Sequence, residues 1–378
     1  MLNSTYAQEL TLLGRHTEVV ELAASAEARV AVAPAYQGRV MTSTLAGEEG
    51  ASFGWLNAPF IESDVHDHPG FNNYGGEDRF WLGPEAGQFG LWFLSGEAMD
   101  VAHAKTPPGF GHGPFPVIRR DDRSVAMARR FEVTNYSGTK FQCAVDRTIT
   151  ALDAERSARD LGAAPPQGVT VVGFESANVL TNAGLEAWTQ AGGLPSVWIL
   201  GQFKAAPACW VVVPLRRGEE ARLGPRANTH YFGAVPADRC VVAEDCVKFK
   251  ADGVYRSKIG VSPARAKSVL GSYDPAAGAL TIVQFNLPKG AAKLPYVNSM
   301  WEIQDRPFAG DAINSYNDTG VRTSAGLEAT FYELETSSPA AFLKPGESIT
   351  HLHRTYHFGG DREGLAKLAK KVLGVELT

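Results

Sequence analysis

Two glutamates and three histidines stand at alternate positions of two apolar stretches near the end of the chain. The first stretch is FYELETSSPA (331–340) and the second is HLHRTYHF (351–358). Successive side chains of a strand point to opposite faces. The two acids therefore share one face of the first strand, and the three histidines share one face of the second strand. If the strands are neighbours, carboxylates and imidazoles meet over one sheet and could transfer protons near neutral pH. The candidate catalytic residues are Glu333, Glu335, His351, His353 and His357.

Alternate histidines are also a possible metal-binding pattern. His351 and His353 could face one ion from a strand, and the stretch DVHDHPGF holds a second alternate pair, His66 and His68. The alternative is ordinary polar decoration of a strand face. The sequence therefore leaves a divalent metal open. It predicts no organic cofactor, because no glycine-rich phosphate motif opens a helix.

The densest polar segment is NNYGGEDRFWLGPEAGQFGLWF (72–93). Glu77, Asp78 and Arg79 follow two glycines and precede the aromatic pair that ends at Trp81. Carboxylates and a guanidinium can bind sugar hydroxyl groups, while an indole can stack on a pyranose face. This composition predicts a sugar-binding segment. A salt-bridged corner that braces two strands is the structural alternative.

Two further segments carry isolated candidates. His230 in NTHYFG could act as an acid, although a lone histidine is more often structural. In DGVYRSKIG, Arg256 and Lys258 share one face if the segment is a strand. They could hold an anionic sugar or bridge neighbouring acids, and we favour the bridge.

The segment 301–320, WEIQDRPFAGDAINSYNDTG, is rich in amide and acidic side chains. Asn314 and Asn317 could hold sugar hydroxyl groups, and Trp301 could supply a stacking face. Asp311 and Asp318 are oxygen ligands of the kind Ca²⁺ prefers, but the spacing of an EF-hand is absent. Turn-forming Asn and Asp residues explain the same composition.

Composition excludes several function classes. The 378 residues carry a formal net charge of −5, with 44% hydrophobic and 20% charged residues. No basic excess points to nucleic acid, and no apolar run approaches the roughly 18 residues of a membrane helix. We therefore expect neither nucleic acid nor membrane as a partner. The N-terminal segment shows no signal peptide, which predicts a cytoplasmic protein, or a periplasmic or secreted one if a signal was removed.

Short strand-like runs dominate the chain, and turn-forming clusters separate them. More than ten such runs are rich in Val, Ile, Thr and aromatic residues. Only two segments read as helices, near 153–162 and at about 361–374. The sequence shows no repeat with a period of 20–50 residues, as a propeller or solenoid would have. The pattern predicts an all-β protein built as a large antiparallel sandwich.

Several long motifs resemble a bacterial family defined as a domain of unknown function within the galactose mutarotase-like superfamily. They are NYGGEDRFWLGPE, GSYD, YVNSMWE, GDAINSYND and FYELETSSPAAFLKPGESITHLHRTYHF. The resemblance implies that residues 1–378 form one β-supersandwich domain with a short C-terminal helix. It also implies a carbohydrate cleft on one concave sheet. In the epimerases of this superfamily a late Glu acts as base and a His as acid.

The resemblance leads to three hypotheses about function. The first is a sugar-modifying enzyme similar to an aldose 1-epimerase, with Glu333 or Glu335 as base and His230 or His351 as acid. The second is a glycoside-cleaving lyase or hydrolase, in which Glu77 joins the late acids and a metal could assist. The third is a non-catalytic carbohydrate-binding protein. In each case the partner is a small carbohydrate or an oligosaccharide, and the oligomeric state is left open.

Overall fold

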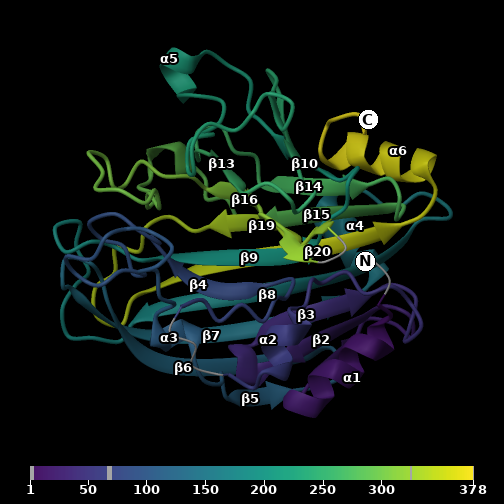
Figure 1. Cartoon of the computed structure of the whole chain (residues 1–378), viewed down its shortest axis with the longest axis horizontal. Coiled ribbons are helices and arrows are strands. Elements are labelled where there is room, and N and C mark those ends of the chain that lie inside the picture. The colour runs from purple at the N-terminus through teal and green to yellow at the C-terminus, as the bar shows by residue number, and fades with distance from the viewer. Residues whose placement is uncertain (1–3, 66–69, 324–325, 378) are drawn as a thin grey trace.

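The computed structural model describes residues 4–65, 70–323 and 326–377, and most of the secondary structure in this part of the chain is β. Two large antiparallel sheets dominate the molecule, with the N-terminal strands along one side and the C-terminal helix at the opposite side (Figure 1). The prediction of an all-β antiparallel fold is confirmed. Side chains from both large sheets share one hydrophobic core, including Phe80 and Ile199 from one sheet and Val145 and Phe174 from the other.

The larger sheet has ten strands in the order β11-β12-β10-β14-β15-β20-β8-β7-β6-β5, and every pairing between neighbours is antiparallel. Its long central strands follow the runs of Val, Ile, Thr and aromatic residues in the sequence. The bounds are β5 Val117–Arg120, β6 Ser124–Thr134, β7 Lys140–Leu152, β8 Thr170–Asn182, β10 Trp210–Pro214, β11 Cys240–Val242, β12 Cys246–Lys250, β14 Val269–Asp274, β15 Ala279–Phe285 and β20 Ser348–Gly359.

The second large sheet has five strands in the order β13-β16-β19-β9-β4, again all antiparallel. A three-stranded sheet, β1-β2-β3, and a two-stranded sheet, β17-β18, complete the β structure of the described residues. The bounds are β1 Val20–Ala23, β2 Arg29–Ala33, β3 Arg39–Thr44, β4 Arg79–Gly83, β9 Ser196–Lys204, β13 Ser257–Val261, β16 Ile313–Asn317, β17 Val321–Thr323, β18 Gly326–Glu328 and β19 Phe331–Ser337.

Both predicted helices are present. Helix α4 is capped by the Asp153 side chain and helix α6 by that of Asp361. The helix that begins at Tyr6 was not predicted, although Thr5 and Gln8 form a capping box there. No helix that the structure describes has the length and apolar content needed to cross a bilayer. The helices are α1 Tyr6–His16, α2 Ala58–Glu62, α3 Pro108–Gly111, α4 Ala154–Leu161, α5 Glu220–Leu223 and α6 Arg362–Val372, with short 3-10 turns at Pro34–Tyr36 and Ala291–Lys293.

The late acidic and histidine-rich stretches lie in different sheets, so the expectation that their side chains meet over one sheet is wrong. Strand β19 lies in the five-stranded sheet and β20 in the ten-stranded sheet. The histidines of β20 point into the space between the sheets, where Thr336 of β19 bridges two of them. The Thr336 hydroxyl is 2.7 Å from His351 Nε2 and 2.8 Å from His353 Nδ1. The glutamates of β19 alternate with Thr336 and face the other way.

We expect Thr336→Val to destabilise the fold, because it leaves both buried imidazoles without the hydroxyl that they share. Each unsatisfied buried group costs about 1–3 kcal/mol. Urea denaturation measures the change in the free energy of unfolding. Thr350→Val, the same substitution at an exposed position of β20, is the control and should stay within about 0.5 kcal/mol. Equal effects of the two substitutions would contradict this account of the bridge.

Burial lowers the pKa of His351 to about 3 and of His353 to about 4, from an ordinary value of 6.5. Between these lowered pKa values and 6.5, the unfolded chain therefore binds more protons than the folded chain. The free energy of unfolding should fall as the pH decreases below about 6.5. Thermal unfolding can be followed between pH 7.5 and 4.5. Over this range the midpoint temperature should decrease less in the double variant His351→Gln, His353→Gln than in the wild-type protein. A parallel pH dependence in the two proteins would contradict this prediction.

Candidate functional site

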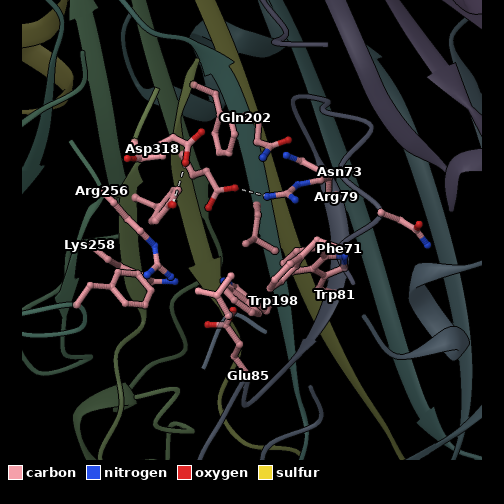
Figure 2. Close-up of a pocket in the computed structure, with 18 of the residues that line it drawn as sticks. Phe71, Asn73, Arg79, Trp81, Glu85, Trp198, Gln202, Arg256, Lys258 and Asp318 are labelled. Atoms are coloured by element: carbon pink, nitrogen blue, oxygen red, sulfur yellow. Dashed lines mark hydrogen bonds and ion pairs between the residues drawn. The ribbon is translucent and has the colours of Figure 1, made fainter. Parts of the chain in front are cut away.

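A cavity of about 360 Å³ lies on the face of the five-stranded sheet that points away from the ten-stranded sheet (Figure 2). Strand β4 contributes Arg79 and Trp81, and β9 contributes Trp198 and Gln202. Strand β19 contributes Glu333. Loop residues such as Phe71, Phe232 and Trp301 complete the lining, so both strands and loops enclose the pocket.

The register of the five strands explains why these side chains meet. Glu333 lies opposite Gln202 on one side and Tyr316 on the other, and Tyr316 in turn lies opposite Lys258. Residues opposite each other in a sheet point to the same face. A row of polar side chains from four adjacent strands therefore lies on the pocket side of the sheet.

Glu333 and Arg79 form a buried ion pair on this side of the sheet, which is the floor of the pocket. Their side chains are 9% and 3% exposed, respectively. Burial raises the pKa of Glu333 to about 7, against the opposing effect of the Arg79 charge, and the nearby Glu335 carboxylate raises it further. A carboxyl group that titrates near neutral pH can take up and release protons under physiological conditions.

Glu335 lies next to Glu333 on the same face of β19 but does not line the pocket. It accepts a hydrogen bond of 2.9 Å from Trp198 Nε1 and one of 3.0 Å from Lys258 Nζ. Glu335 is fully buried. Its carboxylate therefore neutralises Lys258 and orients the Trp198 ring. The prediction that Lys258 bridges a neighbouring acid is confirmed.

A second carboxyl group, Glu85, lines the pocket directly after β4. Burial raises its pKa, while the Lys258 charge acts in the opposite direction. The protonated form of Glu85 is therefore favoured relative to an exposed glutamate. In the view of Figure 2, Glu85 lies at the bottom of the group of side chains and Arg79 lies above it.

Aromatic rings supply most of the remaining wall. Trp81, Trp198, Trp301 and Phe232 all line the cavity, and the Arg79 guanidinium lies 4.4 Å from the centre of the Trp81 ring. Within the described part of the chain, Trp81 Nε1 and Gln202 Oε1 are buried without a hydrogen-bond partner. A free donor and a free acceptor beside flat rings match the hydroxyl groups and apolar faces of a sugar.

Seven of the residues singled out in the sequence line this pocket: Arg79, Trp81, Arg256, Lys258, Trp301, Asp318 and Glu333. The segment 72–93 is thus divided between the pocket and the protein interior. Arg79 and Trp81 point into the pocket, whereas Glu77 and Asp78 lie elsewhere.

Glu77 and Asp78 belong to buried networks outside the pocket. Glu77 Oε2 lies 2.8 Å from His357 Nε2 and also accepts a hydrogen bond from the Ser43 hydroxyl. Asp78 is paired with Arg147 at 2.5 Å, and both side chains are fully buried. These contacts brace one strand against another, which is the structural alternative considered for this segment.

The remaining candidates do not line the pocket. His230 is exposed on a loop, and His351 and His353 lie between the sheets. Asn314 donates to the Ile259 carbonyl, and Asn317 donates to the Tyr255 carbonyl. Their amides stabilise the chain near β13 and β16. His66 and His68 lie outside the described residues.

Several pocket residues were not singled out in the sequence, among them Glu85, Trp198 and Gln202. Glu85 ends the quoted motif NYGGEDRFWLGPE, so its position among polar and aromatic residues was a usable signal. Trp198 and Gln202 lie in the apolar run of β9, and only the strand alternation places them on the pocket face. In the parts of the chain described by the structure, no three His, Cys, Asp or Glu residues converge as a metal site requires.

Residues 4–378 match the model of a family described as a family of unknown function, DUF6786. The chain belongs to this family. A comparison with curated proteins finds no match. The sequence-based prediction of a family defined as a domain of unknown function is therefore confirmed.

Solved structures show the same fold at low sequence identity. A candidate aldose 1-epimerase from Escherichia coli K12 matches with a TM-score of 0.52 and 12% identity, over 91% of this chain and 99% of that chain. A galactose mutarotase-like protein from Clostridium acetobutylicum matches with a TM-score of 0.51 and 10% identity, with the same coverages. The Slr1438 protein from Synechocystis sp. PCC 6803 matches with a TM-score of 0.53 and 10% identity, over 91% and 96%. The DUF6786 chain thus has a galactose mutarotase-like fold.

We expect Arg79→Gln to raise the pKa of Glu333 above its value of about 7, because the Arg79 charge favours the carboxylate. Carbon-13 NMR of labelled glutamate side chains can follow the titration of Glu333. The Glu333 carboxyl signal is identified as the one that is missing from the spectrum of Glu333→Gln. Arg306→Gln, at an exposed position outside the pocket, is the matched control. An unchanged or lowered midpoint in Arg79→Gln would show that the ion pair does not control this carboxyl group.

Proposed function

We propose that this DUF6786 protein is a sugar-modifying enzyme that interconverts the anomers of an aldose by acid–base chemistry. The observation that carries the proposal is the Glu333 carboxyl, which titrates near neutral pH in a pocket walled by indole rings. The fold shared with mutarotase-like proteins supports it. The similarity is too distant to transfer an activity, so the assignment depends on the pocket itself.

In this proposal Glu333 is the general base and Glu85 is the general acid. Glu333 takes the proton from the anomeric hydroxyl group while Glu85 gives its proton to the ring oxygen. The bond between the anomeric carbon and the ring oxygen breaks, and the open aldehyde rotates. The reverse proton transfers close the ring on the other face. Protons are conserved over the cycle, and no cofactor is needed.

The neighbouring residues prepare both carboxyl groups for these roles. Arg79 holds the Glu333 carboxylate in place and keeps its pKa from rising further. Gln202 and Trp81 offer an unpaired acceptor and donor to sugar hydroxyl groups. The acid differs in type from the histidine expected for an epimerase, because the late histidines lie between the sheets.

Glycoside hydrolysis is the second candidate, and one observation favours it. Burial raises the pKa of both Glu333 and Glu85, and both line a single pocket. Hydrolases use two such carboxyl groups on either side of the scissile bond. The pair considered in the sequence, Glu333 with Glu77, does not meet in this structure, because Glu77 is paired with His357 outside the pocket.

Proton NMR of freshly dissolved single anomers tests the proposal. The wild-type protein should accelerate anomer equilibration, and Glu333→Gln should lower the rate by roughly 10²–10⁴-fold, as expected for loss of a general base. The rate should also fall as the pH decreases below about 7, because protonation removes the base form of Glu333. Glu186→Gln, at an exposed position, is the matched control and should keep the wild-type rate.

The same spectra separate the alternatives. New reducing ends from oligosaccharides would identify a hydrolase. Specific line broadening of a sugar without anomer exchange would indicate a binding protein. A normal rate in Glu333→Gln would remove Glu333 from the mechanism.

A further inference from the structure

We infer that the pocket selects a sugar with one carboxylate substituent, a uronic acid, and that Arg256 binds the carboxylate. This inference rests on the proposed function, because it names the substrate class of the same site. It starts from the difference between Arg256 and the other two cations of the pocket, Arg79 and Lys258.

Arg79 and Lys258 are already neutralised within the protein. Arg79 is paired with Glu333, and Lys258 is paired with Glu335 at 3.0 Å. Arg256, two residues before Lys258, also lines the pocket but forms no ion pair with any carboxylate of the described residues. The sequence-based preference for Arg256 as a bridge to a neighbouring acid is therefore wrong.

Aromatic rings hold the Arg256 guanidinium in the wall of the pocket. Its central carbon lies 3.8 Å from the centre of the Phe232 ring and 5.5 Å from the centre of the Trp301 ring. A ring against the flat face of a guanidinium leaves the N–H groups at its edge exposed as donors. The Tyr316 side chain takes part in one hydrogen bond with Arg256, and the remaining N–H groups can bind an oxyanion. A carboxylate fits this edge with two parallel hydrogen bonds.

The other acids of the pocket do not satisfy this cation. The Asp318 carboxylate accepts hydrogen bonds from the Tyr316 hydroxyl at 3.0 Å and the Thr330 hydroxyl at 2.6 Å, and it forms no ion pair with Arg256. The Arg256 charge acts on Glu85 and favours its carboxylate, but burial is the larger effect and favours the neutral form of Glu85. One unpaired guanidinium balances one negative charge, which favours a carboxylate over a doubly charged phosphate.

Isothermal titration with matched sugars tests the inference. Glucuronate and glucose differ only at C6, as do galacturonate and galactose, and glucose 6-phosphate places a phosphate at the same atom. The wild-type protein should bind a uronate more tightly than its neutral partner and more tightly than the phosphate. Arg256→Gln should weaken uronate binding by about 10–100-fold, the usual effect of losing a hydrogen bond to a charged group.

Two further variants separate charge from structure. Arg256→Lys keeps the charge but loses the planar pair of donors, so uronate binding should be intermediate. Arg306→Gln removes an exposed arginine outside the pocket and should bind as the wild type does. Thermal unfolding of each variant checks that the fold is intact.

The outcomes distinguish this inference from the proposed function. Uronate binding that depends on Arg256 without anomer exchange would support the inference and refute the enzyme. Exchange of neutral aldoses without any preference for uronates would support the enzyme and overturn the inference. Tighter binding of the phosphate sugar would also overturn it, and binding of no sugar would overturn both.

Discussion

The alternation of side chains along β19 places one strand between two different environments. Thr336 points to the space between the sheets, where it binds His351 and His353. Glu333 and Glu335 point to the other face, where they pair with Arg79 and Lys258. Because the period of a strand is two, a shift of one residue would exchange the two sets. The contacts between the sheets and the charged floor of the pocket therefore depend on one register.

The pocket floor consists of charges that neutralise one another before any ligand arrives. Burying an unpaired carboxylate or guanidinium is costly, so each buried charge of the floor needs a partner. The fully buried Glu335 is the partner of Lys258. Glu333 is the partner of Arg79, yet its own pKa stays near neutrality, because burial outweighs the attraction of the guanidinium. The same balance that makes the floor stable thus leaves one carboxyl group able to exchange a proton.

The histidines of β20 show the opposite use of buried polar groups. His351 and His353 share the Thr336 hydroxyl, and burial keeps both imidazoles neutral. His357 is held between Thr281 and Glu77. These contacts join the ten-stranded sheet to the strands that cover it. Three histidines at alternate positions are thus explained by structural hydrogen bonds rather than by a proton-transfer site.

The sequence by itself determined the β class, the C-terminal helix and the family. It also singled out Arg79, Trp81, Trp301 and Glu333, which line one pocket in the structure. These follow from local pattern and from long motifs, which need no knowledge of the tertiary contacts. Only the tertiary structure decided that β19 and β20 lie in different sheets, and that Glu85 joins the pocket. Alternation tells which side chains share a face of a strand, but not which strand becomes its neighbour, because pairing between distant strands depends on the packing of the whole chain.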